Sequence, residues 1–164
     1  MYQKGDYINY GGHGVCRIED ITSMNFGGGA GKSYYVIQPI APGSATIYFP
    51  VDSPKAVERM RPLLSKEEID AIIHSVKDEQ MPWIADRKQR TAQFQQILSR
   101  RDERELLLLS SCLHQRQLEK PLPSGEMDML RRVEHIIEQE FAFTLDLHAQ
   151  QIGEYIREEL SQCK

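Results

Sequence analysis

The sequence predicts an α+β protein of two domains, in which residues 1–52 form a small antiparallel β barrel and residues 53–164 form an all-α domain. Two observations support this division. Nine of the eleven glycines lie within the first 50 residues, where they separate short β-prone runs. From about residue 53 onward, apolar residues recur three and four positions apart, as they do on one face of a helix.

Four β-prone runs mark the strands of the first domain. Val15 and Arg17 alternate with Cys16 and Ile18, which is typical of a half-buried strand. Pro50 ends the last run, because proline cannot donate a hydrogen bond to a neighbouring strand. The runs are 6–10, 14–21, 34–37 and 45–49.

Helix-start signals divide the second domain. Ser65 and Glu68 have the spacing of a capping box, and Asp102 and Ser124 are expected to cap two later helices. An acidic helix from about residue 145 ends the chain. The apolar stripes of these helices are Ile69, Ile72, Ile73 and Val76; Leu106, Leu109 and Leu113; Leu130, Val133, Ile137 and Phe141; and Ile152, Tyr155, Ile156 and Leu160.

One further helix is expected from Trp83 to about Ser99. Pro82 is compatible with the first turn of a helix, where the missing N–H is not needed. Thr91, Phe94 and Leu98 are expected on its buried side, because they fall three and four residues apart.

Charge excludes a protein that is basic over its whole surface. The 20 Lys and Arg residues are outnumbered by 24 Asp and Glu, so the net charge is −4. Only residues 81–104 are net basic, with six basic and three acidic side chains. Any contact with nucleic acid must therefore use a local patch.

The remaining composition predicts a cytoplasmic protein. The longest apolar run is four residues, 106–109, which is too short to cross a membrane. The amino terminus has no apolar segment of the kind found in signal peptides. The three cysteines Cys16, Cys112 and Cys163 are far apart and form no CxxC, so we expect no disulfide framework, metal site or cofactor.

Motifs for catalysis are weak. The loop Gly27–Ser33 ends in Gly-Lys-Ser, like a phosphate-binding loop, but Phe26 stands where that motif needs glycine. The following residues are β-prone, whereas phosphate binding needs a helix N-terminus there. The five histidines show no metal-ligand spacing, and no nucleophile has an evident base. We expect no catalytic residues and no enzyme, and a nucleotide hydrolase is the weakest alternative.

The single tryptophan, Trp83, precedes a basic run and has two interpretations. It can anchor the helical core, as most tryptophans do. It can also be an aromatic wedge beside a base, with Arg87, Lys88 and Arg90 holding phosphates. Composition alone favours the core.

Several segments together resemble the CarD/CdnL family of bacterial transcription regulators. The opening Gly5–Ile18 has the family's Gly-Asp, strand and His-Gly turn. Three further segments follow in the family's order and spacing, and the resemblance covers about residues 1–145. These segments are Tyr34–Ile37, Thr46–Asp52 and Met60–Ser65, followed by Trp83, by Leu122–Glu126 and by Met129 with Leu130.

The resemblance implies a Tudor-like β domain that docks on the β subunit of bacterial RNA polymerase through an edge strand, and a helical domain that contacts promoter DNA. The expected polymerase-binding residues are Met24, Thr46, Ile47, Tyr48, Phe49 and Pro50. The expected DNA-binding residues, which would meet the minor groove and the phosphate backbone at the upstream edge of the transcription bubble, are Trp83, Arg87, Lys88 and Arg90.

The function implied is a non-enzymatic regulator that stabilises the open promoter complex and is associated with the nucleoid through polymerase. Met24 and Tyr48 stand where some family members have arginines, and Asp86 would repel phosphate. An adaptor that docks through its β domain without touching DNA remains the alternative. The leucine-rich helices and the acidic tail are compatible with a homodimer as well as with a monomer.

Overall fold

The computed structural model describes residues 2–11, 13–25 and 31–162. The chain divides into two compact units, Met1–Leu63, here the N-terminal unit, and Leu64–Lys164, here the helical unit. The predicted boundary at residue 52 falls earlier than this division. The later boundary has a physical reason, because residues 60–62 form a strand that belongs to the sheet of the N-terminal unit.

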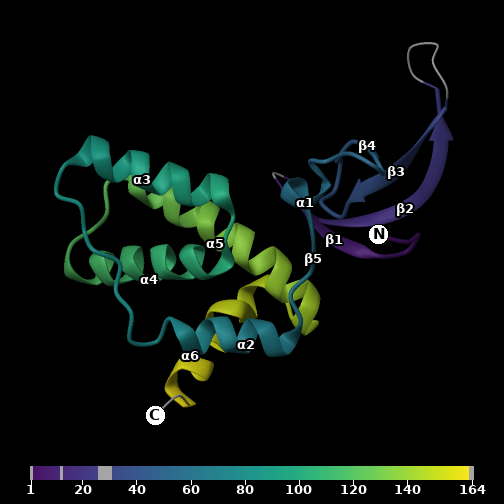
Figure 1. The fold of residues 1–164 in the computed structure, drawn as a ribbon. Coiled ribbons are helices and arrows are strands. Elements are labelled where there is room, and N and C mark those ends of the chain that lie inside the picture. Colours follow the sequence, from purple (N-terminus) through teal and green to yellow (C-terminus); the bar gives the residue numbers. More distant parts are fainter. Residues whose placement is uncertain (1, 12, 26–30, 163–164) are drawn as a thin grey trace. The chain divides into compact units, whose positions relative to one another are not determined.

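The N-terminal unit is an antiparallel sheet with one short helix. Its strands pair in the order β4-β3-β2-β1-β5, so β4 and β5 are the edges (Figure 1). Among the described residues these edges do not pair with each other, so the sheet is not closed into a barrel. The elements are β1 (Tyr7–Tyr10), β2 (Gly14–Met24), β3 (Lys32–Pro39), β4 (Ile47–Pro50), α1 (Ala56–Arg59) and β5 (Met60–Pro62).

The longest pairing of the sheet joins β2 to β3. Its register shifts between Ile18 and Asp20, which leaves a bulge in β2. Gly14, the second residue of the His-Gly turn, has φ of 72°, a left-handed conformation that favours glycine. Alternate residues of the strands bury one face of the sheet. The core residues are Ile8, Tyr10, Cys16, Ile18, Tyr35, Ile37, Phe49 and Met60.

Over its described residues the helical unit has five helices, in agreement with the predicted all-α second half. Helix α4 packs against α5, and α6 packs against both α5 and α2 (Figure 1). Among the described residues, no helix is long and apolar enough to cross a membrane. The helices are α2 (Lys66–Ser75), α3 (Arg87–Arg100), α4 (Glu103–Glu119), α5 (Ser124–Leu145) and α6 (Ala149–Gln162).

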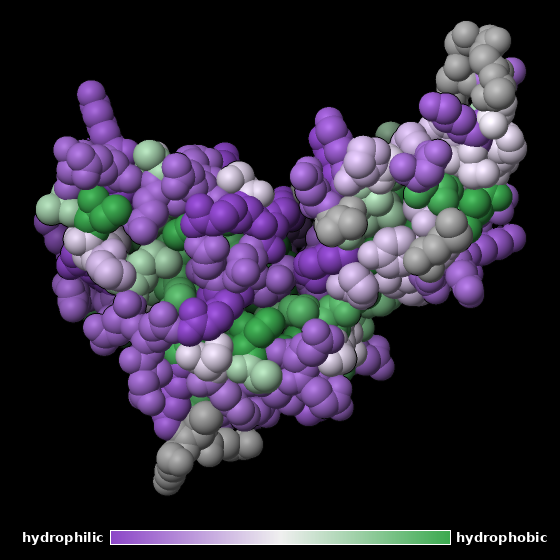
Figure 2. Space-filling view, viewed as in Figure 1, coloured by the Kyte–Doolittle hydropathy of each residue, from purple (hydrophilic) through white to green (hydrophobic). Residues whose placement is uncertain are grey.

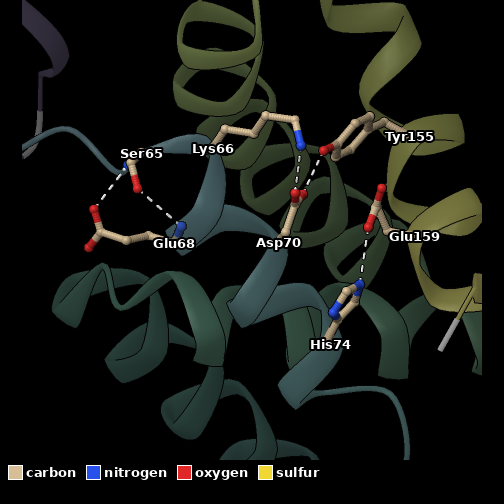
Figure 3. Close-up of polar contacts among 7 residues, drawn as sticks. All are labelled: Ser65, Lys66, Glu68, Asp70, His74, Tyr155 and Glu159. Carbon is tan, nitrogen blue, oxygen red and sulfur yellow. Dashed lines mark hydrogen bonds and ion pairs between the residues drawn. The ribbon is translucent and has the colours of Figure 1, made fainter.

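Two of the predicted helix caps are confirmed. The Ser65 hydroxyl accepts from the Glu68 backbone N–H at 3.1 Å, and the Glu68 carboxylate accepts from the Ser65 N–H at 3.0 Å (Figure 3). The Asp102 carboxylate accepts from the Glu105 N–H. Ser124 is not a cap as predicted, because Pro123 holds that position and Ser124 is the first residue of α5.

The predicted start of α3 is wrong by four residues. The Asp86 carboxylate accepts hydrogen bonds from the N–H groups of Lys88 and Gln89, so Asp86 caps the helix and Pro82 and Trp83 lie in the preceding loop. This shift also changes the buried side of the helix. Thr91 is exposed, and the buried residues are Arg90, Phe94 and Ile97.

Polar contacts join α6 to α2. The carboxylate of Asp70 accepts from Lys66 at 2.8 Å and from the Tyr155 hydroxyl at 2.5 Å (Figure 3). One turn later, His74 lies 3.0 Å from Glu159. Ile152, three residues before Tyr155 on α6, is fully buried. The last helix is therefore part of the helical core, held by several apolar residues and by two polar contacts to α2.

Candidate functional site

Strand β4 is an open edge of the sheet. It pairs with β3 from Ile37↔Ile47 to Tyr34↔Pro50, and within the described residues no strand pairs along its other side. An edge strand presents backbone N–H and C=O groups to which an extended segment of a partner can add. We call Ile47–Pro50 the docking edge.

The side chains of the docking edge alternate between the core and the surface. Phe49 is buried and its ring meets that of Tyr10 edge-on at 5.9 Å. Tyr48 points away from this core and is 47% exposed. Phe49 therefore fixes the strand to the sheet, and Tyr48 is the large side chain available to a partner.

The other predicted polymerase-binding residues lie around this edge. Thr46 precedes β4, and its hydroxyl donates to the Gln38 side chain at 2.8 Å. Met24 ends β2 and pairs with Lys32, beyond the stretch of β3 that pairs with β4. The structure thus brings residues 46–50 together and places Met24 at the far end of the β2–β3 hairpin.

The second predicted surface is built around the loop before α3. Trp83 is half-buried there, with its ring meeting that of Phe94 edge-on at 6.2 Å. Two guanidinium groups stack on the indole, that of Arg90 at 4.5 Å and that of Arg116 at 3.9 Å from the ring centroid. The indole is therefore anchored against the core and keeps part of its surface in solvent.

Arg90 has a structural role in this arrangement. Its side chain is 11% exposed and pairs at 2.8 Å with Glu126, which is 12% exposed. The same guanidinium donates to the carbonyl oxygens of Ile84 and Ala85, at 2.9 and 3.3 Å. Arg90 thus ties the Trp83 loop to α5, and its charge is already balanced within the protein.

The other two predicted DNA-binding cations are available. Arg87 and Lys88 lie exposed in the first turn of α3 and form no ion pair among the described residues. Arg100 and Arg104, by contrast, pair with Glu105 and Glu79. Because a helix N-terminus carries partial positive charge, basic residues there do not favour the helix itself. They follow Trp83 by four and five residues in the chain and remain available to a partner.

A pocket of about 430 Å³ opens beside the indole. Residues 79–83 form one wall, and the carboxy-terminal half of α4 forms the other. Burial raises the pKa of the Cys112 thiol in this wall. We call this feature the indole pocket. The α4 residues that line it are Leu108, Ser111, Cys112, Gln115, Arg116 and Glu119.

Sequence analysis missed this α4 wall. The apolar stripe of Leu106, Leu109 and Leu113 identified the buried side of the helix, but the polar side had no distinguishing pattern. Arg116 lies 33 residues beyond Trp83, so no local spacing rule links the two.

Other predicted features add no site. Gly27, Gly28, Gly29 and Ala30 of the glycine loop lie outside the described residues. Lys32 and Ser33 begin β3 instead of the helix that phosphate binding needs. Within the described part of the chain, no group of three His, Cys, Asp or Glu side chains is placed to hold a metal ion.

Comparison with known proteins identifies the N-terminal unit. Residues 2–64 match the CarD-like/TRCF RID domain. No curated protein matches the chain. The match ends within one residue of the boundary between the two units, and it confirms the resemblance over this part of the chain. Residues 2–64 therefore belong to the CarD-like/TRCF RID domain family, and the match indicates a transcription factor that interacts with RNA polymerase.

Proposed function

We propose that the protein docks on the β subunit of bacterial RNA polymerase through its docking edge and stabilises the open promoter complex by contacting the upstream edge of the bubble with its helical unit. The proposal includes a Tudor-like fold for the N-terminal domain, no enzymatic activity, and a nucleoid location through polymerase. The observation that carries it is the RID domain match over residues 2–64.

The docking edge supports the polymerase contact. Ile47, Tyr48, Phe49 and Pro50 carry no charge, so strand addition there does not require the removal of water from ionised groups. Tyrosine is enriched among the residues that contribute most to binding energy, and Tyr48 is the exposed aromatic residue of this strand. The proposed contact therefore depends on backbone pairing and on one aromatic side chain.

The surface around Trp83 supports the DNA contact. Arg87 and Lys88 have no ion-pair partner among the described residues and are exposed in the first turn of α3, which directly follows the loop of the anchored indole. Such a surface holds the phosphate backbone and presents an aromatic group without reading base sequence. We assign Arg90 to positioning Trp83, because its charge is balanced by Glu126.

Open-complex lifetime tests the proposal. The lifetime would be measured with polymerase holoenzyme and a promoter that carries a fluorescent bubble probe. We expect wild-type protein to lengthen the lifetime and Trp83→Ala to remove this effect. Arg131→Ala/Arg132→Ala, a pair of exposed arginines on α5, is the control and should act like wild type. No change with wild-type protein would contradict the proposal.

An adaptor that does not touch DNA is the second candidate. It is favoured by the contacts of Trp83 with Phe94 and Arg90, which are those of a residue that anchors a core. Under this alternative, Arg87→Ala/Lys88→Ala leaves the open-complex lifetime unchanged while polymerase binding is retained. A shortened lifetime with that double variant would exclude the adaptor.

A further inference from the structure

The indole pocket has the features of a stacking site. Its volume of about 430 Å³ falls within the range of small-molecule sites. Trp83 forms one wall, and Met81 and Pro82 add apolar surface beside it. A flat aromatic group that enters the pocket can therefore lie against the indole and bury its faces.

The place against the indole is now taken by Arg116, whose guanidinium centre lies 3.9 Å from the ring centroid. A guanidinium is planar and occupies the position that a stacked ring would take. The Arg116 side chain is 38% exposed, and its ion pair with Glu119 is long, at 3.7 Å. Arg116 can therefore move aside at small cost, whereas Arg90, buried and paired at 2.8 Å, cannot.

The polar groups of the pocket suit the edge of a base. Ser111, Gln115 and Arg116 offer donors, and Ser111, Gln115 and Glu119 offer acceptors, all along one side of α4. The Watson–Crick edges of bases alternate donors and acceptors in a similar way. Glu79 and Glu119 also line the pocket and are paired with Arg104 and Arg116, so the described lining offers no unpaired cation to a phosphate. The pocket thus favours a base and disfavours the backbone that carries it.

We infer that the indole pocket receives one unpaired nucleobase of a DNA strand, which stacks on Trp83 after Arg116 moves aside and hydrogen-bonds to residues of α4. This inference rests on the proposed DNA contact and adds to it the residues of α4. A paired base is excluded, because its Watson–Crick edge is already bonded. The neighbouring cations Arg87 and Lys88 are left to hold the phosphates outside the pocket.

The test compares forked DNA oligonucleotides that differ in one position, the first unpaired nucleotide, which is either adenine or an abasic sugar. Binding of the full chain is followed by anisotropy of a label on the DNA and by the emission of Trp83, the only tryptophan of the chain. We expect the adenine fork to bind roughly 5- to 100-fold more tightly than the abasic fork, as base–aromatic stacking does elsewhere. Only the adenine fork should strongly quench the emission.

A pair of matched variants locates the base. Ser111→Phe fills the pocket from α4, and Gln117→Phe puts the same side chain on an exposed position of α4 that does not line it. We expect Ser111→Phe to bind both forks equally and Gln117→Phe to keep the preference for adenine. Thermal unfolding of both variants confirms that they fold.

The possible failures are distinguishable. Salt-sensitive binding that is equal for the adenine and abasic forks overturns the pocket inference and leaves the proposed DNA contact standing. Absence of binding to either fork overturns both. Quenching by free adenosine at millimolar concentration, as strong as that by the adenine fork, would assign the pocket to free nucleosides and overturn its role in DNA binding.

Discussion

The two surfaces described here differ in the kind of group that they offer to a partner. The docking edge of the N-terminal unit offers unpaired backbone and the uncharged residues Ile47–Pro50. The Trp83 surface of the helical unit offers an anchored indole together with Arg87 and Lys88, which form no ion pair within the described part of the chain. Binding through the first should depend little on salt, and binding through the second should depend on it strongly. One chain therefore carries two contacts that can be weakened separately.

The same contrast holds for what supports each surface. Backbone pairing with β3 and the apolar packing of Phe49 hold the docking edge, whereas the Trp83 loop is held by a buried ion pair and by stacked guanidinium groups. Figure 2 shows that much of the drawn face of the helical unit is hydrophilic. Removing one partner of a buried ion pair leaves the other charge without compensation. The charged support should therefore be the more fragile of the two.

The largest effect is expected from Arg90→Ala. It leaves Glu126 buried without its partner, so we expect the helical unit to lose about 3–5 kcal/mol of unfolding free energy. Chemical denaturation followed by Trp83 emission measures this loss. The double variant Arg90→Ala/Glu126→Ala should lose less than Arg90→Ala alone. Equal losses would show that the unpaired Glu126 carboxylate carries no burial cost and would contradict this account.

Tyr48→Ala tests the docking edge, the first of the two surfaces. We expect it to weaken binding to the polymerase β subunit by at least tenfold, about 1.4 kcal/mol, without a change in salt dependence. Ile21→Ala, an exposed apolar residue of the interior strand β2, is the control and should bind like wild type. Calorimetry at two salt concentrations measures the affinity of both variants for the β subunit and the salt dependence of that affinity. Loss of binding by Ile21→Ala alone would move the contact from the docking edge to strand β2.

Arg87→Ala/Lys88→Ala should act only on the second surface. Each lost phosphate contact lowers the magnitude of the slope of log affinity against log salt by about 0.9. The slope of the double variant should therefore be smaller in magnitude by about 1.8. The corresponding loss of affinity is about tenfold at moderate salt. A titration of forked DNA at several salt concentrations measures the slope. A slope equal to that of Arg131→Ala/Arg132→Ala would contradict the assignment.

The smallest effect concerns the contacts between α2 and α6. Burial and the hydrogen bond to Asp70 raise the pKa of Tyr155 to about 12. Since the folded state holds this proton more tightly than the unfolded chain, with its pKa near 10, stability should fall as pH rises from about 10 to 12. Tyr155→Phe should cost about 1 kcal/mol at neutral pH and remove this alkaline loss. Denaturation at pH 8 and pH 11 measures both.

Asp70 makes the unfolding free energy depend on pH in the acid range as well. Burial raises the pKa of its carboxyl, but the hydrogen bonds from Lys66 and Tyr155 outweigh burial and lower it overall. The stability that this carboxylate contributes is therefore present above about pH 4 and is lost as pH falls through its lowered pKa. Asp70→Asn should reduce the loss of unfolding free energy between pH 5 and pH 2, as measured by urea denaturation. An unchanged loss in Asp70→Asn would assign the acid dependence to other carboxylates.

Sequence alone predicted those parts of the molecule that depend on neighbours within a few residues. The capping box at Ser65 and the cap at Asp102 each satisfy a backbone N–H three residues away, so their spacing is visible in the sequence. At α3, Pro82 and Asp86 are competing start signals. Asp86 prevails because its side chain bonds to two N–H groups, and periodicity could not show this.

Features that join distant residues were not predictable in this way. Strand β5 has three residues, ends in proline and pairs with β1 some fifty positions earlier. The stacking of Arg116 on Trp83 joins the end of α4 to the loop before α3, and these two segments have no common repeat. The docking edge was found because the family resemblance supplied its position, while its division into a buried Phe49 and an exposed Tyr48 required the sheet register.

The buried thiol of Cys16 provides a way to measure how often the N-terminal unit opens. Its side chain has no solvent exposure, and burial raises its pKa to about 11, so the folded unit holds it as an unreactive thiol. Alkylating reagents attack the thiolate, so they can modify Cys16 only when the sheet opens. The rate of its labelling, followed at this one peptide by mass spectrometry, reports how often the N-terminal unit opens. Trp83 emission reports on the helical unit. The opening of each unit can therefore be followed separately in the same sample.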